Sequence, residues 1–196
     1  MPDHHLDFGH YGATGQRSSL AAAEVLDVLA GGVASPVTTH RGLAARVRYM
    51  TRSRHAHQTM IQEGLKPSPA TIRKWIEGTQ VPRPENLAKI DGIYRQMRRH
   101  NVARYLLQRL NADGGTIIEI HPADDSNVAQ RHRRRDKSVR KVKIRRWDEI
   151  VAAWSEGGWE KGSEQALDDA WIDQLRDAIG SDWGAYEYTR SLGFSA

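Results

Sequence analysis

The sequence contains no cysteine, so disulfide bonds and thiolate zinc sites are excluded and nothing argues for an oxidising compartment. It also lacks an apolar run approaching the roughly 20 residues that a membrane-spanning helix needs. Its first residues do not combine a basic flank with an apolar segment, as a secretory signal does. We therefore expect a cytoplasmic protein that is neither secreted nor embedded in a membrane.

No catalytic constellation is visible either. Histidines occur at positions 55, 57, 100, 121 and 132, but none is joined to a nucleophile or to paired carboxylates at a spacing that catalysis requires. Three more histidines lie among the first 17 residues, in a segment without helical or strand period, where the cost of ordering the chain opposes a specific metal site. We expect no enzymatic activity, no metal and no cofactor.

Acidic residues are scarce over two stretches of the sequence. Residues 40–109 hold fifteen Lys and Arg against four Asp and Glu, and residues 131–146 hold ten against one. The blocks 1–39, 110–130 and 147–196 have net charges of −3, −4 and −8. A merely solubilising surface would mix the signs, so the two basic blocks indicate surfaces that face nucleic-acid phosphates.

The stretch SPATIRKWIEG, residues 68–78, predicts a helix of eleven residues. Ser68 can cap the first free N–H groups, and the proline that follows suits the first helical position because it has no N–H. Ile72, Trp75 and Ile76 recur at spacings of three and four, which defines one apolar face. Gly78 can take the left-handed conformation at which helices often end, and two later prolines prevent the helix from resuming before residue 85.

A shorter helix over residues 55–63 precedes this one, and Gly64 opens a four-residue connection to Ser68. Two helices joined by a short, glycine-containing turn form the helix-turn-helix layout, in which the second helix presents its N-terminal residues to base edges. Ordinary helical hairpins share this layout, so the surrounding positive charge is what favours DNA. Further helices over 40–51, with Arg46 outward, and over 85–110 would complete the bundle.

We expect DNA contacts from this second helix and from the basic runs. Ser68, Thr71, Arg73 and Lys74, near the start of the helix, would contact bases or the nearest phosphates. Gln80 and Arg83, which follow the helix, would flank the groove. The later basic run would bind a DNA backbone or minor groove through Arg131, Arg133, Arg134, Arg135, Lys141, Lys143 and Arg145.

The hydrophobic period changes after residue 115. TIIEI at 116–120 is a short β-rich run, and VRKVKI at 139–144 alternates as a half-buried strand does, so we expect the two to pair as a hairpin. From residue 147 the chain is acidic, with apolar and tryptophan residues at helical spacing and five of the six tryptophans. Such aromatics are usually core, but part of the set could bind a protein partner or mediate self-association.

These patterns predict a mainly α protein with a small β hairpin. A helix-turn-helix bundle would be followed by a basic β/loop region and a short acidic helical C-terminal part. The predicted segments are a mobile arm (1–17), an N-terminal helix and linker (18–39), a helix-turn-helix DNA-binding domain (40–112), a hairpin with a basic loop (113–146) and an acidic, tryptophan-rich helical region (147–196).

The order of parts resembles the terminal, telomere-protecting proteins of linear actinobacterial chromosomes and plasmids. The likeness rests on AARVRYM, on TIRKWIEGTQVPRPENL, on the basic long helix and on TIIEI with the basic region after it, and is strongest over residues 44–90. It implies a replication protein that binds telomeric DNA, works with a partner and is attached to a 5′ end through a side-chain hydroxyl. Ser126 and Thr116 are the hydroxyls available near the ADDSN loop.

Two alternatives remain open. TIRKWIEG also resembles the repressor and Cro type of regulator, and the basic run would suit an adaptor that binds RNA or an acidic protein. If the protein is of the terminal type, we expect it to bind double-stranded DNA, including ends or hairpins, and to be located at the nucleoid. Dimeric binding to a palindrome would favour the regulator, and preference for RNA would favour the adaptor.

Overall fold

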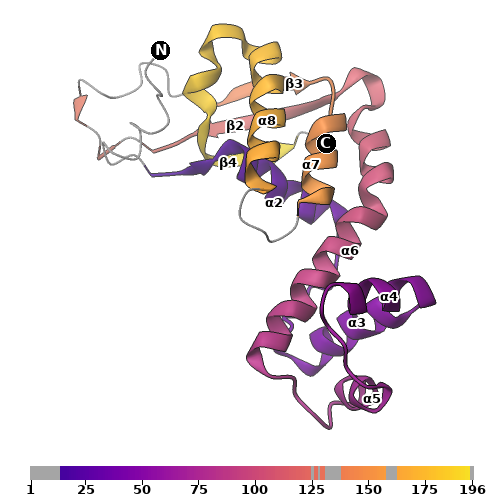
Figure 1. The fold of residues 1–196 in the computed structure, drawn as a ribbon. Coiled ribbons are helices and arrows are strands. Elements are labelled where there is room, and N and C mark those ends of the chain that lie inside the picture. The colour runs from indigo at the N-terminus through magenta and orange to yellow at the C-terminus, as the bar shows by residue number, and fades with distance from the viewer. Residues whose placement is uncertain (1–13, 125, 128, 131–137, 158–162, 195–196) are drawn as a thin grey trace. The chain divides into compact units, whose positions relative to one another are not determined.

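The computed structural model describes residues 14–124, 126–127, 129–130, 138–157 and 163–194 (Figure 1). These residues fall into two compact units. The first unit combines the residues up to Leu29 with those from Ala103 onward, and the second unit is Ala30–Val102. The long helix α6 (Pro84–Leu110) contributes residues to both.

The second unit is helical. It contains α3 (His40–Thr51), α4 (Arg54–Gln62), α5 (Pro69–Glu77) and the first part of α6. Helix α3 packs against both α4 and α5. The apolar core between the helices includes Val47, Met50, Met60, Trp75 and Ile90.

The first unit is built on a four-stranded antiparallel sheet with the strand order β1-β4-β2-β3. The strands are β1 (Gln16–Arg17), β2 (Thr116–Pro122), β3 (Arg140–Ile144) and β4 (Tyr188–Phe194). The helices of this unit are α2 (Ser18–Ala30), α7 (Asp148–Glu156) and α8 (Ser163–Ile179), with short 3₁₀ turns η1 (Ala112–Gly114) and η3 (Gly180–Tyr186). Helix α8 packs against β3 and α7.

The structure confirms the predicted fold class, which is mainly α with a small β component. The predicted hairpin is present, since β2 pairs antiparallel with β3 and places Ile118 opposite Val142. The sheet is larger than predicted, however. Residues 16–17, assigned to a mobile arm, form β1, and residues 188–194, assigned to a helical region, form β4. Both strands owe their conformation to pairing with distant residues rather than to a local pattern.

The tryptophans of the C-terminal region mostly belong to the core. Trp147, Trp154 and Trp171 are almost fully buried. The indole N–H of Trp154 donates to Asp27 Oδ1 at 3.0 Å, and that of Trp171 donates to Ser18 Oγ at 2.7 Å. A partner surface could not use these three side chains, whereas Trp159 lies outside the described residues. Within the described ranges, none of the helices has the length and apolar character needed to span a bilayer.

Candidate nucleic-acid interface

Helices α4 and α5 are joined by a turn that the core holds in place. Gly64 adopts a φ of 81°, in the left-handed region that favours glycine. Leu65 follows it and is buried in the core of the second unit. The two helices predicted around a glycine-containing turn are thus present, and α4 begins one residue earlier than the sequence pattern indicated.

The N-terminus of α5 is capped as predicted. Ser68 Oγ accepts a hydrogen bond from the Thr71 N–H at 3.1 Å, and Pro69 occupies the first helical position. Ser68 Oγ also lies 2.9 Å from Thr71 Oγ1, so one hydroxyl donates to the other. Because each hydroxyl carries one proton, one O–H group of the pair remains available to a phosphate or a base. Both predicted contact residues therefore have a structural role as well.

The C-terminal end of α5 is fixed against α3. Gly78 ends the helix at a φ of 77°, and its N–H donates to Lys74 O. His40, the first residue of α3, has its Nε2 atom 2.9 Å from Ile76 O. A Cβ atom on Gly78 would lie 2.8 Å from the His40 ring, closer than such contacts occur. With both ends fixed, α5 presents its outer side in one orientation.

That outer side carries the predicted cations. Trp75 is buried, as predicted, which places Arg73 and Lys74 at the exposed surface. No described residue provides either of them with a carboxylate partner. Gln80 and Arg83 are also exposed in the segment that follows the helix. Four of the predicted DNA-binding residues are therefore available to a ligand on the same unit.

Further cations surround α4 and α5. The second unit holds thirteen Lys and Arg against four Asp and Glu. Lys66 is exposed two residues before the Ser68 cap, and Arg54 is exposed at the start of α4. Neither Lys66 nor Arg54 is among the DNA-binding residues predicted from the sequence, although both lie in the basic stretch 40–109.

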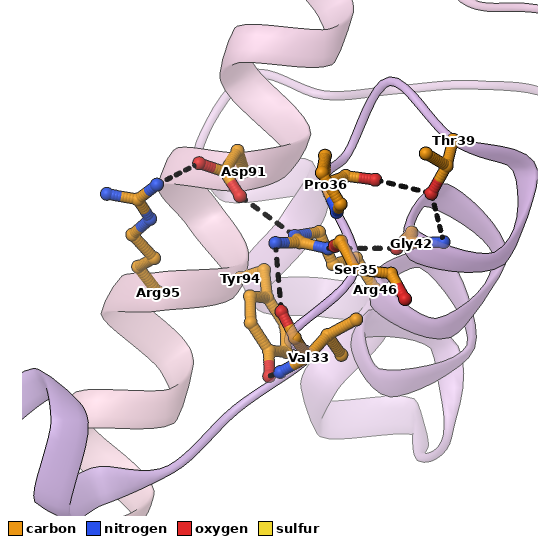
Figure 2. Close-up of polar contacts among 9 residues, drawn as sticks. All are labelled: Val33, Ser35, Pro36, Thr39, Gly42, Arg46, Asp91, Tyr94 and Arg95. Atoms are coloured by element: carbon orange, nitrogen blue, oxygen red, sulfur yellow. Dashed lines mark hydrogen bonds and ion pairs between the residues drawn. The ribbon is translucent and has the colours of Figure 1, made fainter.

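Arg46 corrects the expected outward orientation, because its residue exposure is only 7%. Figure 2 shows its guanidinium among backbone carbonyl groups of α3 and of the segment before it. Nη1 donates to Ser35 O at 2.7 Å and to Gly42 O at 3.1 Å, and Nη2 donates to Val33 O at 3.3 Å. A helical wheel of α3 could not show this, because residues 33–35 fold back over the helix.

The same guanidinium reaches α6. Arg46 Nε donates to Asp91 Oδ1 at 2.8 Å, and the other carboxylate oxygen binds Arg95 Nη2 at 2.6 Å (Figure 2). Tyr94 supports the arrangement, since its ring centroid lies 5.2 Å from the Arg46 guanidinium and its hydroxyl accepts from the Val33 N–H. Arg46 therefore holds α3, α6 and the preceding segment together, whereas Arg95 pairs with Asp91 within α6, and neither is a free cation.

On β3, two of the predicted DNA-binding cations already have partners. Lys141 Nζ lies 2.8 Å from a Glu119 carboxylate oxygen on β2, and this hydrogen bond raises the pKa of the Lys141 ammonium. Lys143 Nζ donates to Asp113 O at 2.8 Å. Arg145 is exposed beyond the strand. These residues belong to the first unit and α5 to the second, so the described geometry does not join them into one site.

The two hydroxyls named from the family resemblance lie in different surroundings. Thr116 Oγ1 is half-buried and donates to Leu110 O at 2.7 Å. Ser126 is exposed in a turn where its N–H donates to Asp124 Oδ1 at 2.9 Å. The predicted contacts Arg131, Arg133, Arg134 and Arg135 lie outside the described residues.

Comparison of the chain with protein-family models, with curated proteins and with solved structures finds no match. The resemblance to terminal proteins and to repressor-type regulators therefore stays a prediction. In the described part of the chain, no group of three His, Asp or Glu side chains is placed to hold a metal ion.

Proposed function

We propose that this protein binds double-stranded DNA at the nucleoid, with α5 in the major groove. The observation that carries the proposal is the division of α5 into a buried face around Trp75 and an exposed face with Arg73 and Lys74, for which the described residues provide no carboxylate partner. In helix-turn-helix proteins the second helix contacts base edges through its N-terminal residues. An exposed arginine there can bind the O6 and N7 atoms of guanine with two parallel hydrogen bonds.

Electrostatics of the second unit support the same ligand. The N-terminus of a helix carries partial positive charge and favours phosphate, and Lys66 lies beside this end of α5 in the sequence. The excess of nine positive charges in this unit would attract a duplex by release of its counterions.

Beyond DNA binding, we propose a terminal-type role in the replication of linear replicons, supported only by the resemblance in the order of parts. One alternative is a transcriptional regulator that uses the same helix pair, and another is an adaptor for RNA or an acidic protein. Sequencing the genomic DNA that co-purifies with the protein separates these roles. Reads at replicon ends support the terminal-type role, reads at promoters support the regulator, and absence of enriched DNA supports the adaptor.

The role of α5 is tested with single variants on a duplex selected from a random pool. Arg73→Ala should lose about 1 to 3 kcal/mol of binding free energy on that duplex and relax preference at one base pair. Lys74→Ala should weaken selected and random duplexes alike and reduce the slope of log affinity against log salt by about one. Fluorescence anisotropy over a salt series measures both effects.

Arg176→Ala is the control for loss of one positive charge, because Arg176 is an exposed cation on α8 of the first unit that already pairs with Asp173. It should bind the selected duplex as the parent does. If Arg73→Ala and Lys74→Ala also bind like the parent, α5 is not the DNA-contacting helix.

A further inference from the structure

The second half of α6 has an exposed face that the proposed role of α5 does not use. Arg104, Tyr105, Gln108 and Arg109 are exposed at positions that fall on one side of the helix, while Leu106 and Leu110 are buried on the other. Tyr105 is 61% exposed, which is unusual for a large aromatic side chain on a helix that packs into a core.

This face is positively charged. The sequence has five arginines and no Asp or Glu from Gly92 to Leu110. Arg95 binds Asp91, and Arg98 donates to Ala30 O at 2.7 Å. In contrast, no described carboxylate pairs with Arg104 or Arg109.

Arg109 also contacts the aromatic ring. Its guanidinium carbon lies 5.7 Å from the Tyr105 ring centroid, within the range of a cation–π contact. The guanidinium occupies one side of the ring, and the exposure of the side chain leaves ring surface open to a second planar group.

The strand β3 adds one cation, Lys143, near the end of this helix. Lys143 Nζ donates to the carbonyl of Asp113, which lies four residues after Arg109. The ammonium of Lys143 is thereby held at the turn that follows α6. The exposed arginines and this lysine all belong to the first unit.

We propose that this face binds single-stranded DNA, with one unpaired base stacked on Tyr105 and the neighbouring phosphates bound by Arg104 and Arg109. Aromatic rings flanked by cations bind single strands because a base offers its π face only when it is not paired and stacked in a duplex. A duplex could use the arginines alone. The choice of DNA over RNA rests on the proposed function of α5. The stacking of a base on Tyr105 does not depend on that function.

The test uses the full chain and a labelled oligo(dT) of about 12 nucleotides, a length within the site sizes of single-strand binders. Tyr105→Ala should lower affinity for this oligonucleotide by about five- to hundredfold, the range for loss of one base–aromatic stack. Tyr105→Phe should restore the affinity of the parent because the ring is retained. Arg104→Ala and Arg109→Ala should each flatten the salt slope by about 0.7.

Val28→Ala is the matched control, since it removes a side chain that is 77% exposed on α2 of the same unit. It should leave oligo(dT) affinity unchanged, and Tyr105→Ala should keep the melting temperature of the parent. The proposal is overturned if Tyr105→Ala binds oligo(dT) like the parent. It is also overturned if this variant loses duplex and single-strand affinity equally, because the face then follows a duplex backbone.

Two further measurements distinguish a failure of this proposal from a failure of the proposed function of α5. The double variant Arg73→Ala, Lys74→Ala should lose duplex affinity and keep oligo(dT) affinity. If that variant keeps duplex affinity while Tyr105→Ala still loses oligo(dT), the function of α5 fails and the single-strand site stands. Tighter binding of oligo(U) than of oligo(dT), abolished by Tyr105→Ala, would overturn the choice of DNA.

Discussion

At the scale of single residues, Trp75 determines which side of α5 faces solvent. It is 3% exposed and packs in the core of the second unit. Its indole N–H has no hydrogen-bond partner among the described residues, so the side chain contributes through packing alone. Residues 74 and 73 lie about 100° and 200° from Trp75 around the helix, so its burial turns both of their cations toward solvent.

Trp75→Ala should lower the free energy of unfolding by about 3 to 5 kcal/mol, since it leaves a large cavity in a small core. Trp75→Phe should cost less, because most of the apolar volume remains and no hydrogen bond is lost. Urea denaturation of both variants measures the difference. DNA binding of the alanine variant should fail only where the protein unfolds. A variant with the melting temperature of the parent and no DNA binding would instead place Trp75 on the DNA surface.

Arg46 and Asp91 form the second residue-scale feature, a nearly buried ion pair whose donors are matched by carbonyl acceptors. Arg46→Ala should lower the free energy of unfolding by about 3 to 5 kcal/mol, because it leaves a buried carboxylate with one partner fewer and carbonyl groups unsatisfied. Arg48→Ala on the exposed side of α3 is the control and should change it by less than about 0.5 kcal/mol. Equal stability of the two variants would mean that the buried guanidinium is not needed to hold the segment before α3.

At the scale of elements, the accuracy of prediction depended on how local the signals are. The bounds of α5 follow from Ser68, Pro69 and Gly78, all within or next to the helix, and the structure places caps at the predicted serine and glycine. Strand β3 is also predictable from the sequence, because its apolar residues alternate with cations. These signals act over a few residues and do not depend on the rest of the fold.

Strands β1 and β4 carry no such signal. Two residues are too few to show a period, and β4 is irregular, with a register shift opposite β2. Thr189 Oγ1 donates to His121 O at this irregularity, a contact between residues 68 apart in the chain. A pairing of this kind depends on tertiary contacts, so the sequence pattern of residues 188–194 does not predict a strand.

The register of the hairpin likewise decided what its cations do. Glu119 and Lys141 are opposite each other in the β2–β3 pairing, which allows their ion pair. The sequence placed Lys141 among DNA-binding residues because it lies in a basic run. Only the pairing of the two strands shows that one of these charges is matched within the sheet.

At the scale of the whole molecule, the basic run 131–146 begins with Arg131, Arg133, Arg134 and Arg135, and its later residues include strand β3. Replacing Arg131, Arg133, Arg134 and Arg135 by Ala should flatten the salt slope of duplex binding by roughly two to four units, since each phosphate contact contributes about 0.9. Affinity for selected and random duplexes should fall similarly, and the melting temperature should hardly change.

A salt series on the selected and random duplexes, with the parent alongside, tests this. Site preference should survive, because α5 would still contact the bases. A quadruple variant that loses discrimination but keeps its salt slope would show that these arginines recognise sequence or DNA shape.

The fold class, the ends and phase of α5, the β2–β3 hairpin and the concentration of positive charge in two blocks can all be predicted from the amino-acid sequence. Those features follow from periodicity, capping and composition, which act locally or sum over many residues. Tertiary structure alone decided what individual cations do: Arg46 is buried on Asp91, Arg98 binds the end of α2, and Arg73 remains exposed. The physical reason is that a charged side chain is paired or free according to which distant carboxylates and carbonyls the fold brings within hydrogen-bond reach.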